Sequence, residues 1–164
     1  MKHGCLILSC ASMQLALPLE SILEVSRMVA PCAKLLRVPR YVLGVVDFHG
    51  QLVPLIDLPA RLGLCPPRSP EALIAGHIAF IELPSGLWGM AVDGVHDLIN
   101  EQMEPLTIEP RHLVGLVLGS LRVSATERAL VLNPSQLLSV VARARIGAEL
   151  SELAKPPERA GGPA

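Results

Sequence analysis

Residues 44–62 of this 164-residue chain, GVVDFHGQLVPLIDLPARL, contain two apolar runs on either side of a His-Gly-Gln turn. Short apolar runs bounded by Gly, Pro and polar residues are typical of strands, so the stretch predicts a β-hairpin. Asp57 precedes a Leu-Pro pair, which indicates a capped turn after the second strand. A second interpretation is a catalytic loop built from Asp47, His49 and Asp57, and residues elsewhere in the chain must decide between the two.

An internal repeat surrounds this hairpin. Residues 17–25, LPLESILEV, align without a gap with residues 90–98, MAVDGVHDL, acid on acid and aliphatic on aliphatic. Residues 44–50 align with 115–121, and the segment that ends at Leu62 aligns with the one that ends at Leu138. A repeat in this order predicts two similar small β-barrels. Asp57 falls on Asn133, so the role they share is capping a turn rather than ionising.

The predicted organisation is one mostly β domain over residues 5–145. The first barrel is expected at about 12–68 and the second at 72–145, while a strand at 5–10 could join either. A short C-terminal helix is predicted over about 140–150, after a cap at Asn133. The tail, residues 151–164, is rich in Pro, Gly and polar residues and is predicted to be disordered.

Composition argues against several classes of protein. Lys and Arg number 14 against 15 Asp and Glu, and only four residues are aromatic, so no basic stripe or stacking platform for nucleic acid is expected. No apolar run approaches the ~18 residues of a membrane span, so we expect no direct membrane insertion. Four scattered cysteines without a C-x-x-C pair are typical of reduced thiols in a cytoplasmic protein.

The sequence contains no convincing catalytic or metal site. Asp93, His96 and Asp97 are close in sequence, but in a strand His96 would point away from both acids. The His and Cys residues show no metal-ligand spacing, and no G-x-S-x-G, Walker A or G-x-G-x-x-G motif occurs. We therefore expect no enzyme activity, no cofactor and no bound metal.

Two stretches resemble CheW-like domains of chemotaxis proteins. GVVDFHGQLVPLIDLPARLGL at 44–64 is similar to the family's hairpin, in which a Gly-Val-Ile-Asn-Leu-Arg-Gly type strand and turn leads into a strand ending Pro-Val-Ile-Asp-Leu. WGMAVDGVHDLI at 88–99 resembles the family's Gly-Leu-x-Val-Asp-x-Val-x-x-Val stretch. The likeness covers roughly residues 6–141. It implies two tandem SH3-like five-stranded β-barrel subdomains, in agreement with the repeat.

The resemblance also implies a non-enzymatic adaptor in the cytoplasm. Such a protein couples the cytoplasmic tip of a methyl-accepting chemoreceptor to the regulatory domain of a CheA-type histidine kinase in membrane-associated arrays. The receptor-binding positions that carry over are Ile22, Glu24, Gly44, Gly89, Val95 and Leu98. The turn His49-Gly50 matches positions tied to receptor and kinase coupling. The family commonly has Arg in place of His49, so the resemblance also allows a divergent pathway that controls pili or surface sensing.

Purely structural roles also stay open for these positions. Gly44 and Gly89 could mark a bulge or a tight barrel corner, and Ile22, Val95 and Leu98 could be ordinary core residues. Alternative functions are an array spacer that binds the kinase without receptor contact and a small-molecule-binding β-barrel. The adaptor interpretation further expects an apolar seam between the barrels that is open enough to accept a receptor helix.

Overall fold

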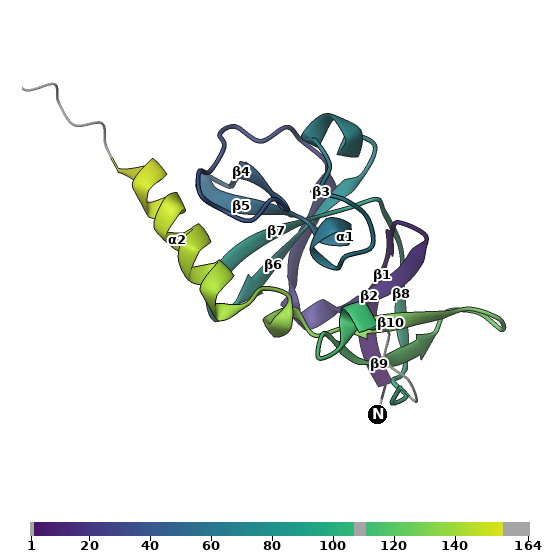
Figure 1. The fold of residues 1–164 in the computed structure, drawn as a ribbon. Helices are drawn as coiled ribbons and strands as arrows, with labels where there is room; N and C mark the ends of the chain where they lie inside the picture. Colours follow the sequence, from purple (N-terminus) through teal and green to yellow (C-terminus); the bar gives the residue numbers. More distant parts are fainter. Residues whose placement is uncertain (1, 107–110, 156–164) are drawn as a thin grey trace, which may run out of the picture.

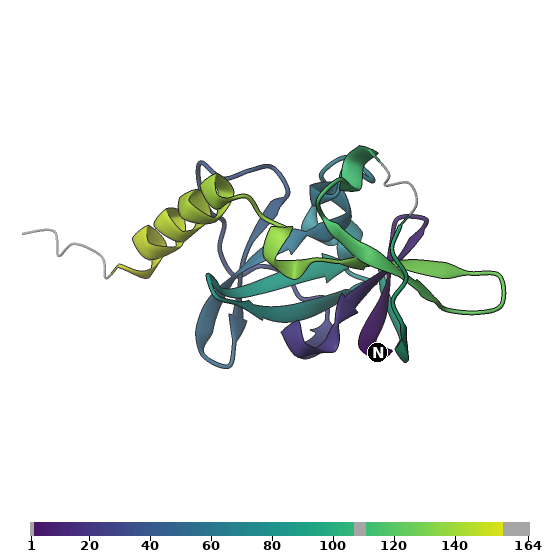
Figure 2. The same cartoon turned by 90° about the horizontal axis from the view of Figure 1, so that it is seen from below.

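The computed structural model describes residues 2–106 and 111–155, which form two five-stranded sheets and a C-terminal helix (Figures 1 and 2). Sheet A has the strand order β8-β1-β2-β10-β9. Its strands are β1 (Lys2–Cys10), β2 (Met13–Pro18), β8 (Gly94–Gln102), β9 (Val117–Arg122) and β10 (Arg128–Leu132). Sheet B has the order β3-β6-β7-β5-β4. Its strands are β3 (Ile22–Arg27), β4 (Val42–Phe48), β5 (Gln51–Asp57), β6 (His77–Leu83) and β7 (Gly86–Val92).

The helices are short except for the last one. They are α1 (Leu58–Arg61), α2 (Val140–Ala154) and the 3-10 turns η1 (Leu19–Ser21), η2 (Pro70–Leu73), η3 (Arg111–Leu113) and η4 (Pro134–Gln136). Asp57 caps α1 as predicted, because its Oδ1 accepts the amide of Ala60 at 3.4 Å. Asn133 makes no side-chain cap bond at η4, and Ser139 caps α2 instead. The predicted disordered tail is wrong for residues 151–154, which extend α2, and from residue 156 the tail lies outside the described residues.

The mostly β class and the two five-stranded units are confirmed, but the units do not follow one another along the chain. Sheet A combines β1 and β2 with β8, β9 and β10, whereas sheet B combines β3, β4 and β5 with β6 and β7. The predicted boundaries, 12–68 and 72–145, therefore do not coincide with the sheets. The reason is that the repeated stretches 17–25 and 90–98 are the connections that cross between sheets, β2 to β3 and β7 to β8.

The repeat is visible in the register of the two sheets. Leu55 pairs with Gly89 where β5 runs parallel to β7, and Val131 pairs with Ala16 where β10 runs parallel to β2. These pairs are equivalent, because Leu55 aligns with Val131 in the third stretch and Ala16 and Gly89 each lie one residue before the first. The middle alignment, 44–50 with 115–121, is wrong. The structural counterpart of Gly44 is Gly119, since Gly44 pairs with Leu55 and Gly119 with Val131.

Each sheet curls until its two ends approach, without a full ladder between them. One isolated bridge, Ala33 with Val45, links the segment after β3 to β4. Its counterpart, Glu104 with Ser120, links the segment after β8 to β9. The sheets are thus open, SH3-like barrels that close at a single point.

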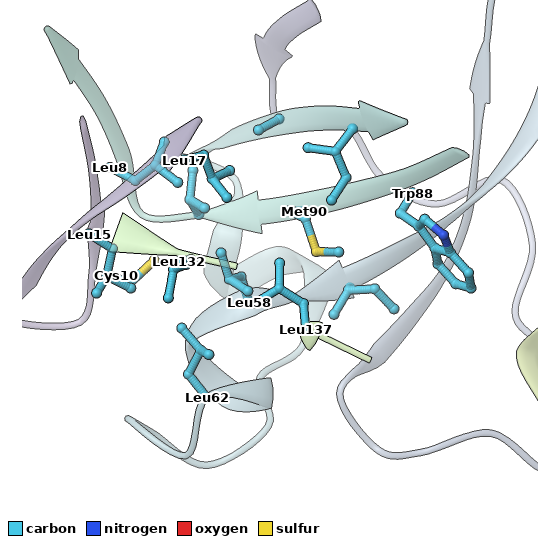
Figure 3. Close-up of a cluster of buried hydrophobic side chains, with 14 of the residues drawn as sticks. Leu8, Cys10, Leu15, Leu17, Leu58, Leu62, Trp88, Met90, Leu132 and Leu137 are labelled. Atoms are coloured by element: carbon cyan, nitrogen blue, oxygen red, sulfur yellow. The ribbon is translucent and has the colours of Figure 1, made fainter. Parts of the chain in front are cut away.

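Three apolar clusters hold these layers together. The largest, which we call the shared core, lies between the sheets and contains side chains from both, among them Leu6, Leu8, Leu17, Ile56, Ile81 and Met90 (Figure 3). Sheet B has its own core around Phe80, Val46 and Leu55, with Phe48 against it. Sheet A has a core of smaller residues around Cys5, Ala16 and Ala129. The shared core makes the two sheets one folding unit.

Candidate functional site

Four residues at the edge strands β3 and β8 lie at the rims of the shared core. Ile22 and Val95 are repeat counterparts, and both are half-buried against the shared core. Further along each strand, Val25 is 37% exposed and Leu98 is 66% exposed. Leu98 pairs with the shared-core residue Leu6, and residues paired directly across a sheet point to the same face. We call Ile22, Val25, Val95 and Leu98 the rim.

Two residues predicted from separate stretches, Glu24 and His49, meet in the structure. The Nε2 of His49, at the tip of the β4–β5 hairpin, lies 3.3 Å from Oε1 of Glu24 on β3. His49 and Gly50 have φ of 49° and 86°, as a two-residue hairpin turn of the I′ type requires. Histidine tolerates this left-handed conformation better than most residues do. The side chain of His49 is 71% exposed and that of Glu24 is 45% exposed, so the pair can meet another molecule.

The two predicted glycines, by contrast, are buried. Gly44 has φ of 141°, sits at a register shift of β4, and a Cβ there would overlap the carbonyl oxygen of Ala33. A Cβ at Gly89 would come within 3.3 Å of the side chains of Ile78 and Leu55. Close packing therefore accounts for both glycines, and direct receptor contact at these positions stays a prediction.

The expected open seam between the barrels is wrong. Figure 3 shows Leu8, Leu15 and Leu17 of sheet A pointing toward Leu58 and Met90 on the other side. All these side chains are fully buried. Aliphatic groups from two curled sheets fill the space at the density of a protein interior, so no partner helix can enter. A partner could reach this core from its edges, where the rim on β3 and β8 is half-buried or exposed.

Sequence reasoning missed an ion-pair network centred on Arg68. Its guanidinium donates to both oxygens of the fully buried Asp57, with the shorter contact 3.0 Å, and to Oδ1 of Asp93 at 2.7 Å. The Oδ2 of Asp93 accepts the amide of Ala11 in the β1–β2 turn at 2.6 Å. The sequence does contain a signal for this network. Asp57 ends an apolar strand, and a carboxylate buried there needs a cation as a partner. The linker carries such a cation eleven positions downstream, at Arg68.

The electrostatics of this network fit a structural role. Partial burial disfavours the charge on Arg68, but hydrogen bonds to Asp57 and Asp93 outweigh it and raise the pKa of the guanidinium. Nearby, burial and then the carboxylate of Asp93 raise the pKa of the Cys10 thiol far above its usual range. Cys10 therefore stays protonated and packs as an apolar group.

The residues considered for catalysis have separate partners. Asp93 belongs to the Arg68 network, whereas the Nε2 of His96 lies 2.8 Å from Oγ of Ser9. This exposed Ser-His pair has no acid bonded to the other ring nitrogen among the described residues. In residues 2–106 and 111–155, no three His, Cys, Asp or Glu side chains gather as a metal site. Over the same ranges, no helix is long and apolar enough to cross a membrane.

Comparison with known proteins decides the family. A family model described as "CheW-like domain" matches residues 4–142. This chain belongs to the CheW-like domain family. A solved structure, the scaffolding protein TtCheW from Thermoanaerobacter tengcongensis, superposes on the CheW-like chain with a TM-score of 0.75 at 21% identity. The match covers 87% of this chain and 96% of that one, and it shows a common fold.

Two curated relatives match over shorter segments. "Chemotaxis protein CheW" of Rhizobium meliloti (strain 1021) is 32% identical over 69 residues, which is 42% of this chain and 43% of that protein. "Probable chemotaxis protein CheW" of Rhizobium etli (strain ATCC 51251 / DSM 11541 / JCM 21823 / NBRC 15573 / CFN 42) is 36% identical over 62 residues, or 37% of each chain. The matched segments thus span less than half the length of these relatives. The CheW-like match ends at residue 142, near the start of α2, so most of that helix lies beyond it.

Proposed function

We propose that this CheW-like chain is a non-enzymatic adaptor in chemosensory signalling. It links the cytoplasmic tip of a methyl-accepting chemoreceptor to the regulatory domain of a CheA-type histidine kinase, in the cytoplasm at membrane-associated arrays. The observation that carries the proposal is the rim: Leu98 leaves most of its side chain in water at the edge of a core that is otherwise closed. Exposed apolar side chains that continue a core are typical of protein interfaces.

The rim suits a helical partner that lies across the surface. A receptor tip is a helical hairpin, and its apolar side chains would cover Leu98 and Val25, with roughly 25 cal/mol gained per Å² of apolar surface buried. The exposed pair of Glu24 and His49 would set the orientation of that helix more than its affinity. Where a relative has Arg at the His49 position, this chain offers an imidazole, which supports a receptor of a divergent pathway.

Coupling through such an adaptor requires rigidity rather than chemistry. The shared core ties both sheets together, so a displacement imposed at β8 or β3 is transmitted to the rest of the molecule. A kinase domain bound elsewhere on the same rigid body would then change its position relative to the receptor.

The decisive experiment changes Leu98→Asp and measures binding to a receptor tip by pulldown and by surface plasmon resonance. Leu98 is mostly exposed, so the fold should be retained, whereas Val95 packs on the shared core and is a poorer choice. We expect roughly a tenfold or greater loss of receptor affinity with kinase regulatory-domain binding retained. Ile74→Asp is the matched control, because Ile74 is 63% exposed and belongs to neither edge strand.

Each outcome separates the candidate functions. Loss of receptor binding in Leu98→Asp alone supports the adaptor and the rim. Receptor binding that is equal in both variants and the unaltered chain contradicts the rim as the contact surface. An unaltered chain that binds the kinase domain and no receptor tip would instead be an array spacer, and a chain that binds neither while retaining a small molecule on purification would be a ligand-binding protein.

A further inference from the structure

Helix α2 is the part of the chain that the adaptor proposal does not use. It spans Val140–Ala154 and lies at the periphery of the molecule, beside the β4–β5 hairpin, with its C-terminal end directed away from the sheets (Figures 1 and 2). Only Ala142 and Ile146 are buried, on the face that packs against the body. The opposite face has no covering element among the described residues.

That opposite face is uncharged and mostly apolar along its length. Val140 and Val141 are each 72% exposed, and the same face continues through Ala144, Ala148 and Ser151, all exposed. Helical residues three, four and seven apart share a face, and none of the residues at these spacings on this face is charged. Leaving two valine side chains of the first turn mostly exposed to water is unfavourable in free energy for a helix without a partner.

The charges that flank this face indicate what covers it. The first half of α2 carries Arg143 and Arg145, and the second half carries Glu149 and Glu152. Arg145 and Glu152 lie two helical turns apart, on the same flank of the apolar face. In an antiparallel pair of identical helices, that flank meets itself reversed, so when the two helices overlap along their full length each Arg145 lies within one turn of the other copy's Glu152. In a parallel two-fold pair this flank would instead face the opposite flank, which carries Arg143, so it could not pair with itself.

From this self-complementary pattern we infer that α2 pairs with α2 of a second copy of this chain, antiparallel, through the face of Val140, Val141, Ala144, Ala148 and Ser151. A two-fold interface requires such self-complementarity. The small side chains at the centre let the two backbones approach closely. Within one chain Glu152 contacts Lys155 at 2.8 Å, but exposed pairs of this kind are weak and can exchange partners.

The dimer should be weak. A helix of 15 residues is about 22 Å long, and a single pair of this length buries less than a standard stable interface. We therefore expect association at concentrations on the order of 100 µM. Such an affinity suits a contact that forms where many copies gather on one array.

A charge-reversal exchange tests the pairing by sedimentation equilibrium from about 10 µM to about 1 mM. Arg145→Glu and Glu152→Arg should each weaken self-association about tenfold or more, because each places like charges opposite one another. An equimolar mixture of the two variants should restore association, because the acid introduced in one chain then faces the arginine introduced in the other. Arg122→Glu, an exposed reversal on β9, is the matched control and should leave association unchanged.

A second variant tests the apolar face without risking the helix. Val141 lies in the first turn, where an acid favours the helix dipole, so Val141→Glu should keep the far-UV circular dichroism of the helix while abolishing association. The inference is overturned if the unaltered chain is monomeric at the highest concentration, if the mixture does not recover association, or if Arg122→Glu acts like Arg145→Glu. None of these outcomes bears on receptor binding through Leu98.

Discussion

The two connections that cross between the sheets share a sequence pattern but are held very differently. At the β7–β8 crossing, Asp93 accepts the amide of Ala11 and bonds Arg68, which also holds the buried Asp57. At the β2–β3 crossing, the counterpart acid Glu20 is exposed, and the bond found there is the local one from Ser21 Oγ to the carbonyl of Pro18. The side-chain hydrogen bonds of one crossing tie it to three other segments, whereas that of the other crossing is local.

The difference comes from the linker between β5 and β6. Only the first half of the repeat is followed by such a linker, and it supplies Arg68. The equivalent point after β10 leads into η4 and α2 instead. The two sheets therefore share an equivalent strand order, while the unrepeated linker decides which crossing is held by an ion-pair network. The anchored crossing fixes the start of β8, and the exposed crossing leaves β3 held by β6 and the contact between Glu24 and His49.

Removing Arg68 should have the largest effect on stability, because it takes away the ion pairs that distinguish the β7–β8 crossing from the β2–β3 crossing. Arg68→Ala leaves Asp57 fully buried with no cation, which we expect to lower the free energy of unfolding by about 3–5 kcal/mol. Urea denaturation followed by circular dichroism measures it.

The matched change at the other crossing is Glu20→Ala, which should alter stability by less than about 0.5 kcal/mol because Glu20 is exposed. Equal losses at the two crossings would show that the Arg68 network does not anchor β7–β8. A double variant, Asp57→Asn with Arg68→Met, should recover part of the loss, since it removes the buried carboxylate together with its cation.

The sequence was sufficient to predict the repeated stretches 17–25 and 90–98, the hairpin and the α1 cap, because each depends on local chemistry. The match of 17–25 with 90–98 placed Ile22 with Val95 and Val25 with Leu98, and the structure gives both pairs the same relation to the shared core. The sequence did not predict that β1 and β2 join the later strands in sheet A, or that β6 and β7 join the earlier strands in sheet B. Periodicity tells which face a residue occupies, but not which sheet its strand joins.

The candidate site could be predicted only in part for a related reason. Glu24 and His49 were both singled out, yet their contact depends on the curl of sheet B, which no local pattern encodes. Arg68 was overlooked because a lone Arg in a Pro-rich linker is normally solvated. The seam was expected to be open because an apolar residue facing a core and one facing a partner look identical in sequence.

A second comparison concerns the glycines at which the two sheets close. Gly44 and Gly119 precede the bridging residues Val45 and Ser120, and a Cβ at either would overlap a backbone carbonyl oxygen across the gap. We expect Gly44→Ala to cost about 3 kcal/mol, because its φ of 141° adds strain, and Gly119→Ala about 2 kcal/mol. Thermal and urea unfolding of the two variants would rank them.

This pair also separates packing from recognition at Gly44, which the family resemblance assigns to receptor binding. If closure explains the glycine, both variants lose stability, and Gly44→Ala binds the receptor tip normally at a temperature where it is folded. A Gly44→Ala variant of unchanged stability that no longer binds the receptor would instead make this glycine a contact residue.

The smallest expected effect is a gain in stability at the β1–β2 turn, whose Ala11 amide donates to Asp93 of the β7–β8 crossing. Ala11 has φ of 55°, a conformation that costs a non-glycine residue roughly 1–2 kcal/mol. Its amide nevertheless donates to Asp93, so the crossing keeps the turn in a strained form. Ala11→Gly relieves the strain but adds freedom to the unfolded chain, so we expect a net gain of about 0.5 kcal/mol and a rise in Tm of about 1–2 °C. A lower Tm would mean that the turn is relaxed with alanine and that Asp93 holds it without opposing strain. In the Arg68→Ala background Asp93 has lost one of its two partners, so the turn is less constrained and the gain from Ala11→Gly should shrink.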